Sequence, residues 1–306
     1  NSFVSFSRRG PRALSGNFNI KESPMRKHLS NIFLVLVLLL GLSLMLYPTV
    51  SDYWNSFTQS RAIASYAEEV ANINEEEYAR IWQEAEAYNL TLHNRTNPYL
   101  LSEEQKSSYD AHLNFSGNGV MGYVEIPSIG CSLPIYHGTS ESVLQIAVGH
   151  LEWTSLPVGG TGNHCVISGH RGLPSAKLFT DLDKLAEGDV FLLRVLNEIL
   201  TYEVDKISIV EPDDTQNLLI EPGKDYCTLV TCTPYGINTH RLLVRGHRIE
   251  NIEESKVIRV TADAIQIEPM VVAPIALIPI LILFMFILLM SDNSHTTKHG
   301  GNKYDE

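Results

Sequence analysis

Two long stretches without a charged residue constrain this chain more than any other feature of its sequence. The first covers residues 29–50 and the second covers residues 269–290. About 20 helical residues are enough to cross the hydrocarbon core of a bilayer. A core helix of this length in a soluble protein would carry a polar stripe, and neither stretch has one. The sequence therefore predicts an integral membrane protein with two transmembrane helices.

The charges that flank these stretches predict how the chain is oriented. Six basic residues precede the first stretch, with Glu22 as the only opposing acid: Arg8, Arg9, Arg12, Lys21, Arg26 and Lys27. Lys298 and Lys303 follow the second stretch. Because basic flanks favour the cytoplasmic side, we expect residues 1–28 and 291–306 to be cytoplasmic tails and residues 51–268 to lie outside.

The first apolar stretch and the residues before it allow two further expectations, one on cleavage and one on the start of the protein. The first stretch could be a cleaved signal peptide, but no small-x-small cleavage site follows Leu46-Tyr47-Pro48, so we interpret it as an uncleaved anchor. Met25-Arg26-Lys27-His28, directly before the apolar run, has the form of a bacterial membrane-protein start. We therefore expect residues 1–24 to be an upstream extension or a fragment boundary.

The outside portion opens with a helical pattern over residues 51–92. Apolar residues recur there at spacings of three and four, and Asn74 followed by Glu77 resembles a capping box that separates two helices. We expect their apolar stripe to pack on the domain that follows. Residues 93–117 are rich in Asn, Pro, Ser and Gly and read as a loop, and residues 251–268 read as a linker before the second membrane helix.

Residues 118–250 have a mainly β pattern. Eight short β-rich runs are separated mostly by turn residues, and they cover 123–127, 133–136, 165–168, 190–195, 201–204, 207–210, 227–231 and 242–245. Short helices are expected near 141–146 and 176–185. Many short strands with little helix predict a closed β-barrel of about 130 residues.

The composition excludes two classes of protein. The chain has 35 acidic and 23 basic residues and a net charge of -12, which argues against nucleic acid as a partner. A hydrophobic content of 44% with only 19% charged residues is too apolar for a disordered chain.

The four cysteines are Cys131, Cys165, Cys227 and Cys232. Cys227 and Cys232 lie five residues apart on one predicted strand, so they are about 16 Å apart and on opposite faces. A disulfide needs Cα atoms within about 7 Å, so these two cannot pair with each other. We interpret Cys131 and Cys165 as small buried apolar residues.

Cys232 has surroundings that suit chemistry. It ends an apolar run at the turn Pro234-Tyr235-Gly236, Arg241 opens the next predicted strand, and His170 follows the end of another. A free thiol has a pKa of about 8.5, so a nearby positive charge increases the fraction present as the reactive thiolate. A histidine can carry the proton to a leaving amine, and an arginine can hold an oxyanion.

A zinc site is the alternative for the same part of the chain. Its candidate ligands are His164, Cys165, His170, Cys227, Cys232, His240 and His247. They do not show the Cys-x-x-Cys or His-x-x-x-His spacing of common zinc sites, which favours the Cys–His–Arg interpretation.

The residues around Cys232 resemble a known family. Thr228-Leu229-Val230-Thr231-Cys232 is similar to the Thr-Leu-x-Thr-Cys motif of sortases, and its continuation to Gly246 resembles the class C, pilin-polymerising branch. Gly169-His170-Arg171 resembles the histidine motif of the family, and residues 119–127 resemble its first barrel strand. The resemblance covers residues 118–250.

This resemblance implies a fold and an activity. Sortases are membrane-bound transpeptidases of Gram-positive bacteria built on an eight-stranded β-barrel. The resemblance implies no cofactor and no metal for this chain. The resemblance implies that Cys232 is the nucleophile, His170 the general acid and base, and Arg241 the group that holds the carbonyl. The substrates would be pilins or surface proteins with a Leu-Pro-x-Thr-Gly-like sorting signal, cleaved between Thr and Gly and joined to a pilin lysine.

Two alternatives to pilin polymerisation stay open. The acceptor could be a cell-wall amine, which would make the protein a sortase that anchors surface proteins to peptidoglycan. The chain could also be a non-catalytic membrane scaffold for pilus assembly, although Cys232, His170 and Arg241 argue against it.

The resemblance also implies a lid, and here the sequence departs from the family pattern. Class C sortases usually carry Asp-Pro-aromatic before the barrel, and this chain has Asn97-Pro98-Tyr99. We expect Tyr99 to cover Cys232 and uncharged Asn97 to make at most a neutral hydrogen bond with Arg241. An ordinary Asn-Pro turn is the alternative.

Overall fold

The computed structural model describes residues 24–93, 95 and 97–251. The described residues from Leu44 onward belong to one compact unit. The second predicted transmembrane helix (269–290), the linker beyond residue 251, the C-terminal tail and the basic residues before residue 24 lie outside the described residues.

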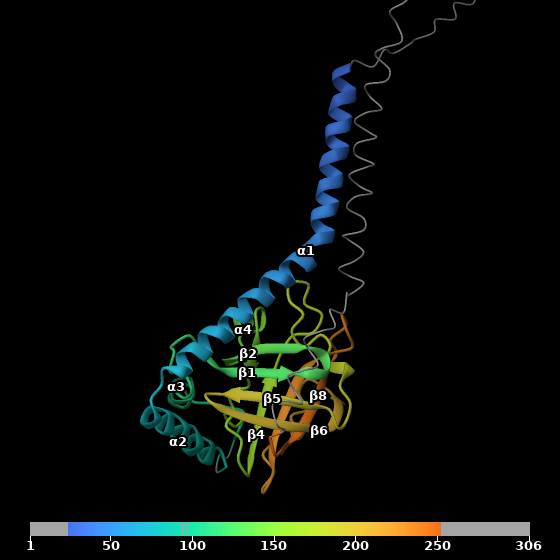
Figure 1. Cartoon of the computed structure of the whole chain (residues 1–306). Coiled ribbons are helices and arrows are strands. Elements are labelled where there is room, and N and C mark those ends of the chain that lie inside the picture. Colours follow the sequence, from blue (N-terminus) through green and yellow to red (C-terminus); the bar gives the residue numbers. More distant parts are fainter. Residues whose placement is uncertain (1–23, 94, 96, 252–306) are drawn as a thin grey trace, which may run out of the picture. The chain divides into compact units, whose positions relative to one another are not determined.

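Helix α1 (Pro24–Ala71) contains the first predicted membrane span. Its apolar part has a mean hydropathy of 2.4 and is not buried against other residues, so it is long and apolar enough to cross a membrane. The helix continues without a break from this stretch into residues that pack on the barrel (Figure 1).

Helix α2 (Glu75–Leu92) begins where the sequence predicts a break. The side-chain oxygen of Asn74 accepts a hydrogen bond from the backbone N–H of Glu77 at 2.8 Å, which caps the helix. Tyr66 and Val70 of α1 and Ile81 and Ala85 of α2 are buried in the same core as the barrel residues. The prediction that these helices pack on the following domain is confirmed.

Helix α3 (Glu103–Ala111) corrects the prediction of a loop over residues 93–117. Ser102 and Gln105 form a reciprocal capping box at its start, with bonds of 2.8 and 3.2 Å. Tyr109 is fully buried, and its hydroxyl accepts a hydrogen bond from the backbone N–H of Gly138. The helix forms because its ends are capped and its one large aromatic side chain is buried.

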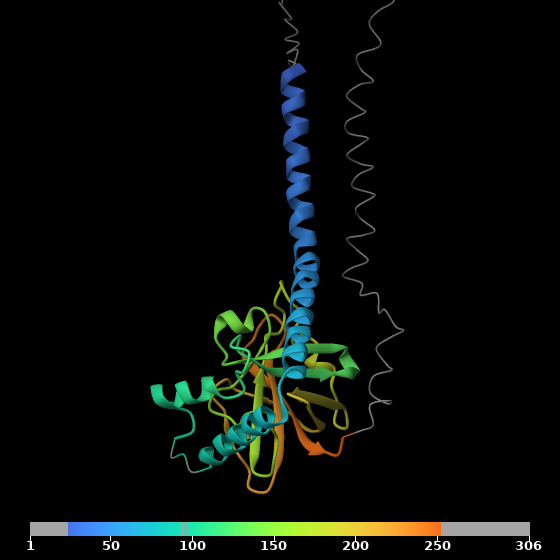
Figure 2. The same cartoon turned by 60° about the vertical axis from the view of Figure 1, so that its left-hand side comes forward.

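Eight strands close into a barrel in the order β1-β2-β3-β4-β7-β8-β6-β5 (Figures 1 and 2). Their bounds are β1 Val120–Ile126, β2 Cys131–His137, β3 Val148–His150, β4 Asn163–Ser168, β5 Val190–Val195, β6 Glu198–Val210, β7 Asp225–Thr233 and β8 His240–Ile249. The pairs β2–β3 and β4–β7 are parallel and the others are antiparallel. The predicted closed barrel is confirmed.

Two of the predicted strands differ in the structure. The runs 201–204 and 207–210 form one long strand, β6, whose pairing with β8 shifts between Val204 and Lys206. Strand β3 has three residues, and the sequence analysis does not predict it. The predicted number of strands is therefore right, but two predicted strands are one strand in the structure and β3 is an additional one.

The connections contain four short helical segments. Helix α4 (Glu141–Leu144) lies where a short helix is predicted, and η1 (Pro127–Ile129) follows β1. The helix predicted over 176–185 is wrong, since η2 (Leu182–Lys184) is the only helical turn described there. The segment η3 (Gln216–Leu218) lies between β6 and β7.

Strand alternation separates the two faces of the barrel wall. Cys165, Cys227 and Leu229 are buried in the main core, which fills the interior. Thr228, Val230 and Cys232 alternate with these residues along β7 and therefore point to the outer face. The buried state predicted for Cys165 is confirmed, whereas Cys131, for which burial was also predicted, is only partly buried. All four cysteines are free thiols.

Candidate active site

Three adjacent strands bring the predicted catalytic residues to one level of the outer face. Cys232 of β7 pairs directly with Arg241 of β8. Strand β4 runs parallel to β7, with Ser168 opposite Val230, and the hydroxyl of Thr231 donates to the carbonyl of Gly169 at 2.7 Å. Two residues beyond Ser168, His170 therefore comes level with Cys232. We call His170, Cys232 and Arg241 the catalytic row.

His170 is held by its backbone and has an unengaged ring nitrogen. Its carbonyl accepts a hydrogen bond from the N–H of Phe179 at 3.1 Å. Its side chain is 29% exposed, and Nε2 lies 4.0 Å from Oε2 of Glu141, beyond hydrogen-bond distance. This nitrogen is shielded from solvent and has no hydrogen-bond partner among the described residues. Glu141 is therefore the nearest carboxylate to this ring nitrogen among the ion pairs of the described residues.

Among the described residues, Arg241 makes side-chain hydrogen bonds from one terminal nitrogen only. One terminal nitrogen lies 3.4 Å from the carbonyl of Asn238 and 3.2 Å from that of His240. Among the described residues no carboxylate forms an ion pair with Arg241. A guanidinium without a neighbouring anion can bind developing negative charge beside Cys232.

Arg171 is a further residue at this site that the sequence analysis does not single out. Its guanidinium forms an ion pair with Asp183 and donates to the hydroxyl of Thr233 at 3.2 Å. It therefore joins the segment after β4 to the residue that follows Cys232. The only sequence signal for this role is its place in the Gly-His-Arg motif.

An apolar cluster occupies the outer face next to the catalytic row. Its buried members are Val166, Leu218, Val230 and Leu243, and Leu151, Trp153 and Val210 pack against them. Val230 and Leu243 lie two residues along their strands from Cys232 and Arg241. Since two residues of a strand span about 6.6 Å, this surface is close enough to contact apolar groups of a peptide bound at Cys232.

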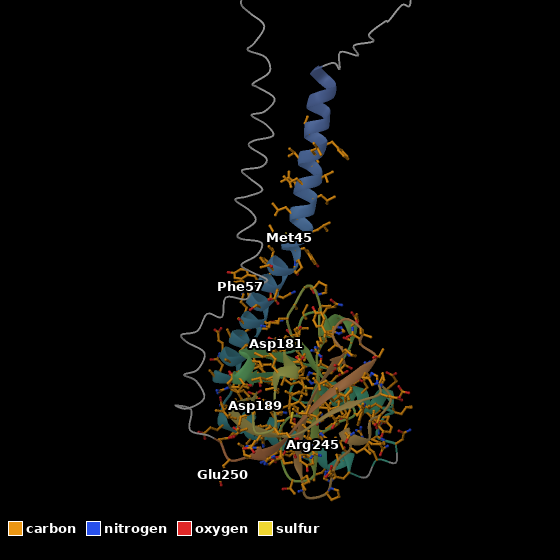
Figure 3. The ribbon with its side chains drawn as sticks, turned by 90° about the vertical axis from the view of Figure 1, so that its right-hand side faces the viewer. Met45, Phe57, Asp181, Asp189, Arg245 and Glu250 are labelled. Atoms are coloured by element: carbon orange, nitrogen blue, oxygen red, sulfur yellow. The ribbon has the colours of Figure 1, made fainter. Side chains whose placement is uncertain are left out.

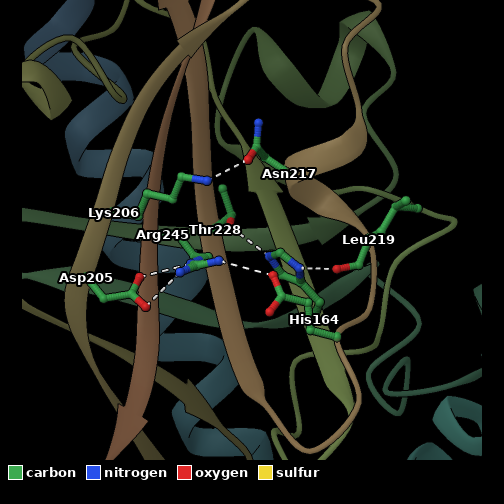
Figure 4. A network of polar contacts seen from close by, with 8 residues as sticks. His164, Asp205, Lys206, Asn217, Leu219, Thr228 and Arg245 are labelled. Atoms are coloured by element: carbon green, nitrogen blue, oxygen red, sulfur yellow. Dashed lines mark hydrogen bonds and ion pairs between the residues drawn. The ribbon is translucent and has the colours of Figure 1, made fainter.

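A polar network on the same face holds the connection between β6 and β7 (Figure 4). Arg245 binds both carboxylate oxygens of Asp205 at 2.9 Å and reaches Glu221 at 3.3 Å. Its guanidinium also lies 4.0 Å from the centre of the Tyr226 ring. Lys206 donates to the side chain of Asn217 at 2.8 Å.

His164 adds a contact from β4 to the same connection. Its Nδ1 lies 2.9 Å from the carbonyl of Leu219, and its Nε2 lies 2.7 Å from the hydroxyl of Thr228. Burial lowers the pKa of His164, so the neutral ring is favoured, with Nδ1–H donating to Leu219. These contacts fix the segment that carries Leu218 over the apolar cluster.

The same geometry leaves the zinc alternative without support. Both nitrogens of His164 are engaged, and Cys165 and Cys227 face the barrel interior while Cys232 faces outward. Within the described part of the chain, no three His, Cys, Asp or Glu residues are arranged to hold a metal ion.

The segment proposed as a lid makes contacts other than the ones expected. The side-chain oxygen of Asn97 accepts from the N–H of Tyr99 at 3.2 Å, whereas the guanidinium of Arg241 binds backbone carbonyls. The ring of Tyr99 packs edge-on against Trp153, with centroids 5.0 Å apart, and is 42% exposed. Tyr99 thus lies against the apolar cluster beside the catalytic row, and its role as a lid stays a prediction.

A cysteine, a histidine and an arginine at or just beyond adjacent strand ends of a closed barrel are the residue types that a cysteine-dependent acyl transfer requires. Residues 124–249 match the sortase domain. A crystal structure of sortase C1 from Streptococcus agalactiae is 50% identical, with a TM-score of 0.62, and the match covers 63% of this chain and 100% of that one. This chain belongs to the sortase family.

Other solved structures and curated relatives agree. The sortase C of Clostridium perfringens solved with the C-terminal cell wall sorting motif is 47% identical, with a TM-score of 0.56, over 63% of this chain and 100% of that one. A Streptococcus pneumoniae sortase C, described as informative on pilin substrate specificity, is 46% identical, with a TM-score of 0.55, over 62% and 97%.

Among curated proteins, sortase D of Bacillus subtilis is 33% identical, over 42% of this chain and 63% of that protein. Sortase A of Streptococcus agalactiae is 32% identical, over 37% and 47%. The chain therefore spans less than two thirds of the length of these curated relatives.

Proposed function

We propose that this protein is a membrane-anchored cysteine transpeptidase that joins sorting-signal proteins to a pilin lysine. The observation that carries the proposal is that Cys232 of β7 pairs with Arg241 of β8, while His170 follows the end of β4, the parallel neighbour of β7. The row lies on the outer face of the barrel wall, where a chain as long as a protein tail has access.

In the first half of the reaction, the Cys232 thiol gives its proton to His170, and Sγ attacks the threonine carbonyl of a Leu-Pro-x-Thr-Gly-like signal. The carbonyl oxygen becomes negatively charged, and the guanidinium of Arg241 stabilises it. His170 gives a proton to the glycine nitrogen as the C–N bond breaks, so the glycine leaves as a neutral amine. The product is a thioester between Cys232 and the threonine carbonyl.

In the second half, a lysine amine attacks the thioester. The amine loses a proton to His170, the new C–N bond forms, and Cys232 leaves as a thiolate. The unengaged Nε2 of His170 supports this double role. The apolar cluster beside the row offers a surface for the Leu-Pro part of the signal.

Two features support the membrane location and the choice of acceptor. Helix α1 is apolar enough to anchor the chain, and we propose that the barrel lies outside the cell with both termini in the cytoplasm. The solved neighbours at 46 to 50% identity are sortases C, and one of them is described in terms of pilin specificity. This favours a pilin lysine over a peptidoglycan amine.

The test is the full chain in detergent or nanodiscs, incubated with a fluorogenic sorting-signal peptide and, separately, with pilin. We expect Cys232→Ala to abolish cleavage and polymer formation while the protein stays folded. Cys165→Ala, at a core position on the other face, is the matched control and should keep activity. Pilin polymers formed by Cys232→Ala would overturn the assignment, and products joined only to cell-wall amines would favour peptidoglycan anchoring.

A further inference from the structure

One face of helix α1, directly after its apolar stretch, carries three polar residues. Asp52, Asn55 and Gln59 are spaced by three and four residues, so they share one side of the helix. All three are half-buried, whereas Tyr53 and Trp54 beside them are 75% and 68% exposed. The polar face is therefore the one turned toward the barrel.

The first two of these residues hydrogen-bond to the backbone of the connection between β4 and β5. Asp52 Oδ1 accepts from the N–H of Lys177 at 2.6 Å. The side-chain amide of Asn55 donates to the carbonyl of Ser175 at 2.7 Å. Figure 3 labels Asp181 farther along this connection, which lines a small hollow together with Asp52 and Gln59.

His170 is the second residue of this connection, and later residues of the connection fold back onto it. The N–H of Phe179 donates to the carbonyl of His170 at 3.1 Å, and the N–H of Gly172 donates to the hydroxyl of Thr180 at 3.2 Å. Phe179 is fully buried. Only one residue, Leu178, separates the position held by Asp52 from the residue that holds the backbone of His170.

Gln59 reaches a second segment beside the same imidazole. Its side-chain amide donates to the carbonyl of Ile146 at 2.7 Å. Ile146 follows helix α4, and its N–H bonds to the carbonyl of Val143 within the end of that helix. The first residue of α4, Glu141, lies 4.0 Å from Nε2 of His170.

We propose that Asp52, Asn55 and Gln59 are positioning residues for His170. From one face of α1 they hold both segments that flank the imidazole, and so keep it level with Cys232. The helix that carries the apolar stretch is thereby part of the active-site scaffold as well as an anchor. The effect on catalysis rests on the proposed function, whereas the effect on the loop does not.

The activity test uses a double variant, Asp52→Ala together with Asn55→Ala. The variant is compared with wild type, each as the full chain in nanodiscs. We expect peptide cleavage to lose about tenfold or more in kcat, because small misplacements of a catalytic group are costly. KM should change little, since the apolar cluster is untouched. Asp52→Asn keeps a side-chain oxygen that can accept from Lys177 and should retain most of the activity.

The matched control is Thr58→Ala with Ser60→Ala, on the same helix. Their hydroxyls donate only to carbonyls one turn earlier, at 3.0 and 2.9 Å, and both residues are exposed. The control should behave as wild type in kcat, KM and thermal midpoint. A drop equal to that of the Asp52 and Asn55 variant would show a general effect of the helix and overturn the proposal.

Hydrogen exchange separates this inference from the proposed function. We expect residues 170–181, including the N–H of Phe179, to exchange faster in the Asp52 and Asn55 variant than in the control. Unchanged exchange would overturn the inference even if the wild type cleaves sorting signals. Faster exchange with unchanged kcat would overturn the positioning role. A wild type inactive on sorting-signal peptides would instead overturn the proposed function, and exchange would still decide whether α1 holds the loop.

Discussion

Arg245 offers the sharpest test of the energetics on the outer face of the barrel. It forms a bidentate ion pair with Asp205, and the two side chains are 17% and 23% exposed. Losing one partner of a fully buried pair costs about 3–5 kcal/mol, and a charge-assisted hydrogen bond contributes about 1.5–3 kcal/mol. Because the pair keeps some solvent contact, we expect Arg245→Ala to lower the free energy of unfolding by about 2–3 kcal/mol.

This loss should be visible as a change in thermal midpoint. For a domain of this size, each kcal/mol shifts the midpoint by about 2–4 °C, so the expected decrease is roughly 4–12 °C. Arg245→Lys keeps the charge but not the two-pronged geometry, and should lose about half as much. The measurement is the unfolding of the full chain in detergent, followed by intrinsic fluorescence.

Arg80 provides the matched control for this experiment. It pairs with Glu84 one helical turn away, and the two side chains are 59% and 52% exposed. Such exposed pairs contribute about 0.3–0.5 kcal/mol, so Arg80→Ala should barely change the midpoint. If Arg245→Ala and Arg80→Ala shifted the midpoint equally, the Arg245–Asp205 pair would contribute no more than a surface contact.

Three further predictions concern the site. Arg241→Lys should lose nearly as much kcat/KM as Arg241→Ala, because a planar fork can hold a carbonyl and a neighbouring group together; a Lys variant with most of the activity would reduce Arg241 to a source of charge. Tyr99→Ala should speed thiol labelling of Cys232, because the ring of Tyr99 packs against Trp153 of the neighbouring apolar cluster; a rate equal to that of wild type would leave the segment an ordinary turn. Burial lowers the pKa of His164 in the folded chain. As the pH falls, this imidazole therefore becomes protonated in the unfolded chain before it does in the folded one, and the free energy of unfolding should decrease below about pH 6.5. His164→Gln should flatten that part of the pH dependence of the thermal midpoint, and an unchanged profile would contradict it.

The sequence predicts the barrel and the strand ends that carry the site because both depend on local patterns. The end of β7 at Cys232 is marked by the turn that follows it, and the start of β8 near Arg241 by the next apolar run. That His170 lies level with Cys232 depends instead on parallel pairing between β4 and β7, whose partners are 62 residues apart at Ser168 and Val230. From the sequence, the position of His170 at a strand end made this grouping with Cys232 a hypothesis, and the family resemblance then strengthened it.

The missed elements also have physical reasons. Strand β3 has only three residues, too few to show alternation. The two predicted runs within β6 are separated by Asp205 and Lys206, which read as a turn but form an irregularity in a continuous strand. Helix α3 is missed because the residues on both sides of it are typical of loops, although Ser102 and Gln105 have the spacing of a capping box.

The anchoring of the β6–β7 connection has a consequence for protein engineering. His164 binds this segment through the backbone carbonyl of Leu219, a group that every amino acid supplies. The pairing of β6 with β8 shifts between Val204 and Lys206, so Asp205 and Lys206 both lie opposite Arg245. Because of this bulge, two residues adjacent in the chain can both make contacts on the same face of the barrel wall. The side chain of Leu218 is itself a buried member of the apolar cluster, so exchanging it would reshape the proposed peptide surface while the strand residues keep the connection in place.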